Sequence, residues 1–318
     1  MEPGHRLVFC VLNEDENMVI ENMLTMQLVM FSLVVIGFIV RKRGIIGGEA
    51  RKDMIDFCLF VTLPFNILNS FLGEWDFSML ASCAMILLLS TGYNAISVLI
   101  SYLLYNKEED KKQKTLRYGT IVSNGGFLGN PVLEGIYGTS GAFYASIFMF
   151  PVRVVMWSVG VSVFLKGHKQ NVLKKIVTNP CIVVMFIGAI IMGSGIALPE
   201  FMLKTISGIS SCNMPLSMML IGMFLAEINP KGLIDRTMVF YTGIRLIGIP
   251  LIIFAITAFL PIDPMLRGIT VIIAGMPAPI TTALLSAKYG GDEKYATGMI
   301  FLSTIVSLLT LPIWCLFL

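Results

Sequence analysis

Charged residues are scarce in this sequence. They make up only 14% of the 318 residues, whereas hydrophobic residues make up 56%. Soluble domains have about 25% charged and about 45–50% apolar residues. A soluble fold of this length could not bury so much apolar surface, so we expect hydrocarbon to be its solvent. The scarcity of charge therefore excludes an ordinary soluble domain and predicts an integral membrane protein.

The sequence also lacks the residue patterns of common catalytic and metal sites. Its two histidines, His5 and His168, lie outside the long apolar runs, which excludes a buried histidine relay. The six cysteines have no CxxC or other metal-ligand spacing and are interpreted as packing residues. There is no GxxxxGK[ST] sequence to bind ATP, no GxSxG and no nucleic-acid module. We therefore expect no enzyme activity, no cofactor, no metal and no nucleic-acid partner.

Long apolar runs fill most of the chain. Crossing the hydrocarbon takes a helix of about 20 mainly apolar residues. The first run is expected to stay as an anchor, because acidic residues precede it and Arg41-Lys42-Arg43 follows without a signal-peptide cleavage site. The runs predict an all-α membrane protein with ten transmembrane helices, at about residues 20–40, 54–72, 79–105, 117–137, 141–165, 179–197, 205–227, 237–260, 266–287 and 295–318.

Lysine and arginine are concentrated between alternate spans. With the N-terminus outside, most of the 23 lysines and arginines fall in cytoplasmic loops, and the external segments keep only Arg6, Lys204 and Arg267. Cytoplasmic loops of membrane proteins collect such residues. We therefore predict a multi-pass protein of the cell (plasma) membrane with both termini external.

Short patterns recur in the two halves of the chain. Tyr137-Gly138 bridges the fourth and fifth predicted spans, and Tyr289-Gly290 bridges the ninth and tenth. Because each half contains five spans, the halves would enter the membrane from opposite sides, which makes the repeat inverted. The predicted organisation is an external tail (1–19), a first five-helix repeat (20–165), a cytoplasmic linker (166–178) and a second five-helix repeat (179–318).

Helix-breaking residues interrupt the fourth and ninth spans. The fourth contains SNGGFLGNP at residues 123–131, and the ninth contains GMPAP at residues 275–279. Backbone groups freed inside a bilayer are costly unless protein or a water-filled cavity surrounds them. Two interpretations are open: a pair of proline kinks without a site, or non-helical segments at 124–131 and 275–279 that meet near the midplane. In the second, Asn130 would cap a half-helix with Pro131 at its first position, and its positive end would attract an anion.

Three ionisable residues lie within predicted spans, where charge is expensive and indicates function. Arg245 has two equally favoured interpretations, a fork that binds a substrate carboxylate or a member of a structural ion pair. For Arg153, a structural ion pair with Glu134 is favoured over substrate binding. Glu134 would carry a coupling proton or have a structural role, in a buried pair or in a solvated cavity wall, and the structural role is favoured. Together the three charges favour an anionic substrate.

Three segments give the sequence a resemblance to a known family. They are SNGGFLGNP with the following YG, NMPLSMMLIGMFLA, and the stretch from AGMPAP to LLTLPIW. They resemble the fourth, seventh and last two helices of the auxin efflux carrier family, whose bacterial members include malate and malonate permeases. The resemblance implies ten helices in a five-plus-five inverted repeat, with broken helices four and nine crossing around the substrate. The implied crossover residues are Asn124, Asn130, Pro131, Pro277 and Pro279.

The resulting prediction is a secondary transporter, a permease for a small organic anion. The linker at 166–178 is as short as in the prokaryotic branch, so we expect a mono- or dicarboxylate such as malate or malonate, moved by alternating access at the crossover. The alternatives are an exporter of an auxin-like amphipathic weak acid and, in a different class, a membrane channel or sensor. The expected partners are the anion, the lipid bilayer, a coupling proton or sodium ion, and a second copy of the chain in a homodimer.

Overall fold

The computed structural model describes residue 25 and residues 28–72, 79–164, 178, 180–196, 198–227 and 234–318. Throughout these residues the regular structure is helical, and they contain no β-strand. An all-α fold is therefore confirmed for this part of the chain. The predicted tail (1–19), and the predicted linker (166–178) except residue 178, lie outside the described residues.

The first half of the chain contains a helix at residues 28–42, followed by long helices that contain π-helical turns. In the helix from Gly48 to Ser70, a π turn separates two α-helical parts. The bounds are α2 Gly48–Phe57, η1 Cys58–Thr62, α3 Leu63–Ser70, α4 Met79–Leu104, α5 Asp110–Ile121, η2 Gly125–Gly129, α6 Asn130–Val155 and η3 Met156–Gly160.

The second half has a similar series of helices. A π turn again lies inside a long helix, between α11 and α12. The bounds are α8 Pro180–Ser194, α9 Glu200–Ser211, α10 Asn213–Glu227, α11 Arg236–Gly243, η4 Ile244–Gly248, α12 Ile249–Ala258, α13 Pro264–Ala274, α14 Thr281–Tyr289 and α15 Glu293–Leu316.

Local sequence sets several of these helix ends. Asp235, Asp263 and Asp292 precede α11, α13 and α15, and each carboxylate accepts a backbone N–H two or three positions on, at 2.7–2.9 Å. The first N–H groups of a helix have no partner inside it, so these caps fix where the helices begin.

Two of the chain turns are made by glycine: Gly138 has φ 63° and Gly290 has φ 76°. The recurring Tyr-Gly pattern therefore marks a left-handed glycine in each half.

Five helices within the described residues are long and apolar enough to cross a bilayer, namely Met79–Leu104, Asn130–Gly160, Glu200–Glu227, Arg236–Ala258 and Glu293–Leu316. Pro180–Ser194 and Pro264–Ala274 are apolar but shorter. These helices support a membrane protein with transmembrane helices. The total of ten spans and the inversion of the repeat stay predictions.

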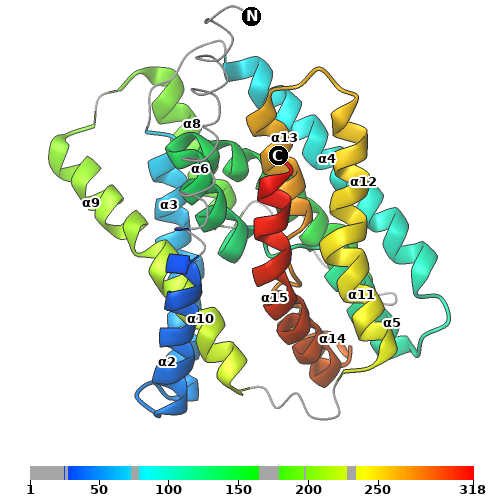
Figure 1. Cartoon of the computed structure of the whole chain (residues 1–318). Coiled ribbons are helices and arrows are strands. Elements are labelled where there is room, and N and C mark those ends of the chain that lie inside the picture. The colour runs from blue at the N-terminus through cyan, green and yellow to red at the C-terminus, as the bar shows by residue number, and fades with distance from the viewer. Residues whose placement is uncertain are drawn as a thin grey trace, which may run out of the picture.

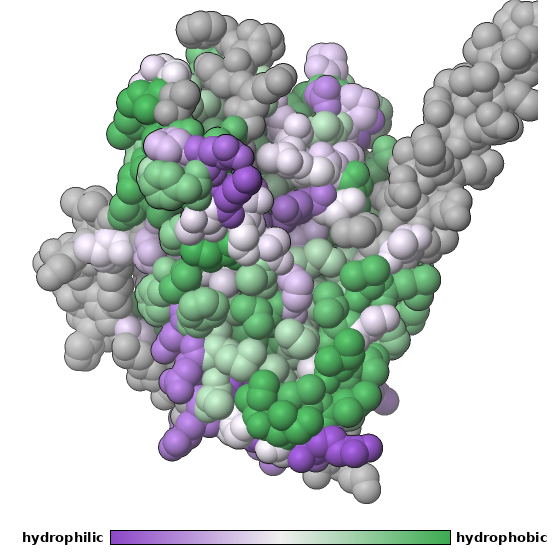
Figure 2. All heavy atoms as spheres, turned by 90° about the vertical axis from the view of Figure 1, so that its left-hand side faces the viewer, coloured by the Kyte–Doolittle hydropathy of each residue, from purple (hydrophilic) through white to green (hydrophobic). Residues whose placement is uncertain are grey.

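The helices form two groups with α6 between them (Figure 1). α2, α3, α8, α9 and α10 lie together, with α3 packed on α8 and α9. α4, α5 and α11–α15 form the other group, in which α12 packs on α13 and α14 on α15. Figure 2 shows hydrophobic residues over much of the face at the left of Figure 1. Phe186, Ile190 and Phe201 are among the exposed apolar side chains, as expected for a surface that faces lipid.

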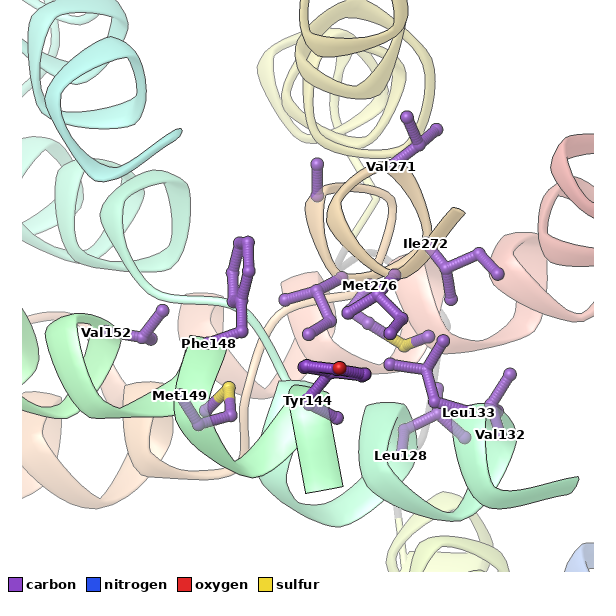
Figure 3. Packing of buried hydrophobic residues seen from close by; sticks show 14 of the residues in the cluster. Leu128, Val132, Leu133, Tyr144, Phe148, Met149, Val152, Val271, Ile272 and Met276 are labelled. Carbon is purple, nitrogen blue, oxygen red and sulfur yellow. The ribbon is translucent and has the colours of Figure 1, made fainter. Parts of the chain in front are cut away.

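A hydrophobic core connects α6 with α13 and the segment after it. Figure 3 shows Leu133 of α6 and Met276 on neighbouring segments, and both belong to one buried cluster. The backbone approaches this core closely at Gly125. A Cβ atom there would lie 2.5 Å from Met149 Sδ and 3.3 Å from Ile273 Cγ2. A larger residue at this position would displace its neighbours.

Candidate functional site

The fourth predicted span is interrupted where α5 ends. Residues 122–124 are non-helical and lie between α5 and the π turn η2. The predicted break at 124–131 therefore began two residues after the observed break and extended too far along the chain. Gly125–Gly129 form a wide helical turn that continues as α6. Glycine has no side chain to crowd such a turn. Pro131 falls in the first turn of α6, where its missing N–H is tolerated.

The ninth predicted span is interrupted where the sequence indicated. α13 ends at Ala274, residues 275–280 are non-helical, and α14 begins at Thr281. The backbone N–H of Asn124 donates to the carbonyl of Pro277 at 2.9 Å. The two breaks, which come from opposite halves of the chain, are therefore in direct main-chain contact.

Other backbone groups at the crossing also have protein partners. The N–H of Ala278 donates to Ser303 Oγ of α15 at 3.1 Å. The hydroxyl of Tyr241 donates to the carbonyl of Gly119 near the end of α5, at 2.9 Å. Non-helical backbone persists at membrane depth only where the protein or a cavity satisfies it. This pattern favours a crossing stabilised by specific contacts over two simple proline kinks.

Arg245 links the two breaks. It lies in the π turn η4 and is completely buried. Its guanidinium donates to the carbonyl of Met276 at 2.9 Å, to that of Thr120 at 2.9 Å and to Tyr93 Oη at 2.8 Å. Met276 belongs to the second break and Thr120 to the end of α5. Of the two roles left open by the sequence, these neutral acceptors favour the structural one, through main-chain dipoles in place of an ion pair.

The structure separates the other predicted crossover residues. Asn124 and Pro279 line a cavity beside the crossing, whereas Asn130, Pro131 and Pro277 are outside its lining. Asn130 is helical, with φ −58° and ψ −51°, and no side-chain cap precedes it. Its amide group has no hydrogen-bond partner among the described residues. The predicted cap at Asn130 is wrong, because the helical chain already begins in η2.

The cavity has a volume of about 290 Å³. Its walls come from the crossing, from the helix that contains α2 and α3, and from one face of α6 and η3. The last wall consists of side chains spaced by one, three or four residues, a spacing that places them on one helix face: Met149, Val152, Arg153, Met156 and Trp157. Figure 3 shows Met149 and Val152 along α6. Most of the lining is apolar.

Arg153 is the basic residue of this lining. It is 5% exposed, one of its N–H groups lies 3.8 Å from Met185 Sδ, and its Nη2 has no hydrogen-bond partner among the described residues. The predicted ion pair between Arg153 and Glu134 does not form. At 1.5 Å per residue, Arg153 lies about 20 Å beyond the turn at Gly138, whereas Glu134 lies one helical turn before it.

Glu134 lies in a separate polar cluster between α3, α6 and α9. Its carboxylate accepts from Asn66 Nδ2 at 3.0 Å, and the same nitrogen donates to Ser210 Oγ at 3.2 Å. One turn earlier on the same helix, Thr62 Oγ1 donates to Asn213 Oδ1 at 3.2 Å. None of these residues lines the cavity. The coupling candidate and the cavity are therefore different places.

Two residues of the cavity lining were not singled out by the sequence: Ser123 was not a candidate, and Arg153 was interpreted mainly as a member of an ion pair. Ser123 is 3% exposed, lines the cavity, and its hydroxyl has no hydrogen-bond partner among the described residues. For Arg153 the available signal was its spacing from Met149 and Met156, which indicates one helix face. No sequence signal placed that face against the break at Asn124.

Comparison with known proteins gives the family of the chain. The sequence profile described as "Membrane transport protein" matches residues 23–172 and, a second time, residues 166–315. The chain belongs to this family. It is the auxin efflux carrier family that the motifs resembled, so that resemblance is confirmed. The two matches also show that this membrane transport protein contains two similar halves.

Two archaeal proteins are similar to this membrane transport protein over most of their length. An uncharacterized transporter of Methanothermobacter thermautotrophicus is 29% identical over 288 residues, which cover 89% of this chain and 94% of the relative. An uncharacterized transporter of Methanocaldococcus jannaschii is 26% identical over 302 residues, covering 90% and 96%. Neither name states a substrate. The family and the relatives indicate transport across a membrane.

Proposed function

We propose that this membrane transport protein is a secondary transporter that moves a small organic anion by alternating access at the crossing of its two broken helices. The observation that carries the proposal is the cavity beside the crossing, with Asn124 and Pro279 from the two halves and the buried cation Arg153 in its wall. Its volume lies near the lower end of small-molecule sites, about 300–1,000 Å³. Interrupted helices around a central site are typical of secondary transporters.

Alternating access would come from movement between the two helix groups. The α2–α3 helix forms one wall of the cavity, including Asp56 and Leu63, and the crossing forms another. A second cavity of about 290 Å³ lies at the other end of α3, beside Ser70 and Thr139. With ten spans, an inverted repeat and both termini external in the plasma membrane, the Asp56 end is cytoplasmic. The cavity beside the crossing then belongs to an inward-facing arrangement.

Two substrate classes fit this proposal. The basic side chain in the cavity favours a mono- or dicarboxylate, such as malate or malonate. The rest of the lining favours an auxin-like amphipathic weak acid, because Leu59, Phe60 and Met156 offer it apolar surface. The two substrate classes differ in how many of their charges need a partner in the cavity. Competition between anions of the two classes for uptake therefore distinguishes them.

The test is uptake into liposomes that contain the purified full-length protein. Labelled malate, malonate and benzoate are offered with a proton gradient, with a sodium gradient and with neither, and protein-free liposomes serve as the control. We expect saturable, protein-dependent uptake of at least one anion, exchange against the same anion inside, and accumulation above the external concentration when a gradient is present. Accumulation of this kind excludes a channel. No saturable uptake or exchange of any anion would contradict the proposal.

A further inference from the structure

We propose that Arg153 binds the carboxylate of the transported anion and that Ser123 supplies a second donor. This inference rests on the proposed function and adds the residues that recognise the substrate. Both side chains line the cavity, and they are 5% and 3% exposed. Each has a donor without a hydrogen-bond partner among the described residues, Nη2 in Arg153 and Oγ in Ser123.

The surroundings of Arg153 leave its charge without compensation. Two neighbours of the guanidinium are the sulfur of Met185, at 3.8 Å, and the thiol of Cys181, and sulfur is a weak acceptor. Within the described chain Arg153 forms no ion pair. A buried charge without a partner is costly both in protein interiors and in membranes. An anion in the cavity would supply the missing charge and the missing acceptor.

Arg245 provides the contrast within the same molecule. Its guanidinium is saturated by three oxygen acceptors that belong to the crossing, and it does not line the cavity. Its hydrogen-bond donors are therefore already occupied and are not available to a ligand. Of the two arginines that are buried in the described part of the chain, only Arg153 combines access to the cavity with an unused donor. This difference assigns recognition of the anion to Arg153.

The charged residues in the cavity lining suit the binding of one carboxylate. Arg153 is the only basic residue in the described lining, and Asp56 is the only acidic one. The unpartnered Nη2 of Arg153 and the Ser123 hydroxyl would supply one donor to each oxygen of a single carboxylate. A second carboxylate would meet either apolar side chains or the negative charge of Asp56, which is exposed at the α2 end. We therefore expect monocarboxylates to bind more tightly than dicarboxylates.

Binding to the purified full-length protein tests this assignment. The probes are hexanoate, benzoate, malonate, malate and the neutral benzamide. Binding is measured by thermal stabilisation and by tryptophan fluorescence, because Trp157 lines the cavity.

We expect Arg153→Gln to weaken carboxylate binding by about 30-fold or more and to leave benzamide binding unchanged. Arg153→Lys restores part of the affinity, since it keeps the charge and loses the fork. Ser123→Ala weakens binding by about 10-fold. Arg267→Gln, at an arginine outside the cavity, is the matched control.

The outcomes separate this inference from the proposed function. If the wild-type protein binds a carboxylate and folded Arg153→Gln binds it equally well, Arg153 is structural and the inference is wrong, while the transporter proposal stands. If Arg153→Gln does not fold, Arg153→Lys and Ser123→Ala decide: wild-type affinity in both contradicts the inference. If the wild-type protein neither binds nor transports any of the anions, the proposed function is wrong and this inference with it.

Discussion

A single buried side chain, Arg245, joins the end of α5 to the second break. Removing its guanidinium leaves two main-chain carbonyls and the Tyr93 hydroxyl without their donor. Each unsatisfied buried group costs about 1–3 kcal/mol, so we expect Arg245→Gln to destabilise the ligand-free protein by about 2–5 kcal/mol. The measurement is the unfolding midpoint in detergent, with Arg267→Gln as the control. An unchanged midpoint together with lost carboxylate binding would return Arg245 to the substrate-binding role.

Glu134 offers a residue-scale test of coupling. Glutamine keeps an oxygen that can accept the N–H bond from Asn66, so we expect Glu134→Gln to fold and to bind substrate at neutral pH. If Glu134 carries the coupling proton, uptake by the variant should lose the pH dependence of the wild-type protein. The measurement is uptake into liposomes at a series of pH values, with Asn66→Ala to show the effect of losing the hydrogen bond alone. An unchanged pH profile would make Glu134 a structural acceptor.

At the scale of elements, the bend inside α6 depends on one backbone conformation. Gly138 has φ 63° and ψ −151°, a region that is essentially restricted to glycine. No atom lies within 4 Å of a Cβ added there, so the cost of alanine is conformational. We expect Gly138→Ala to destabilise the protein by about 1–3 kcal/mol. The measurement is again the unfolding midpoint.

Gly92 in α4 is the matched control for this substitution. It also has open space around an added Cβ, but its φ is not positive. Alanine within a helix is favoured over glycine by about 0.5–1 kcal/mol, so Gly92→Ala should stabilise the protein slightly. Equal effects of the two substitutions would show that the bend does not require the positive φ of Gly138.

The ends of α5, α11 and α15 are joined by a polar cluster. Lys112 Nζ lies 2.7 Å from Asp235 Oδ2, and Tyr295 Oη donates to Asp235 Oδ1 at 2.9 Å. Burial alone would raise the pKa of Asp235, but hydrogen bonds from Lys112, the Met238 N–H and Tyr295 outweigh it and lower the pKa. A carboxyl group with a lowered pKa stabilises the folded state above its ordinary pKa, and this contribution is lost as the pH falls through the lowered value.

We therefore expect Asp235→Asn to reduce stability at neutral pH by about 0.2–1 kcal/mol, the range of partly exposed ion pairs. Asparagine still caps a helix, so the loss should come mainly from the charge. Thermal unfolding of the variant should also be less sensitive to acid than that of the wild-type protein. Glu200→Gln, which removes the exposed pair with Lys204, is the control and should change little. A wild-type acid response in Asp235→Asn would contradict the linkage.

The helices and the breaks were predictable from the sequence to different degrees. Apolar runs and aspartate caps are local signals, so the helices follow from them. Glycine and proline placed the second break correctly, but the extent of the first depended on how Gly125–Gly129 wind. Next to this turn Asn124 bonds to Pro277, and Gly125 packs near Met149, and neither partner is a sequence neighbour. The role of Arg245 was harder to predict, because two of its three acceptors are main-chain carbonyls, which every sequence contains.

For the whole molecule, the distribution of lysine and arginine predicts that both termini are external. A reporter that is active only outside the cytoplasm, fused after Leu318, should therefore be active. The same reporter fused after Asn106, in a predicted cytoplasmic loop, is the control and should be inactive. The opposite pattern would reverse the orientation, and activity at both positions would contradict the number of spans between them.

The main-chain bond between Asn124 and Pro277 also has a consequence for how the protein is made. Nearly half of the chain separates its two ends, and ribosomes add about 5–20 residues per second. The N–H of Asn124 therefore enters the membrane on the order of ten seconds before its acceptor has been synthesised. During that time the broken helix must be sheltered by water, lipid head groups or the insertion machinery. A nascent chain stopped after the first half should stay bound to that machinery, and release should await the segment that contains Pro277.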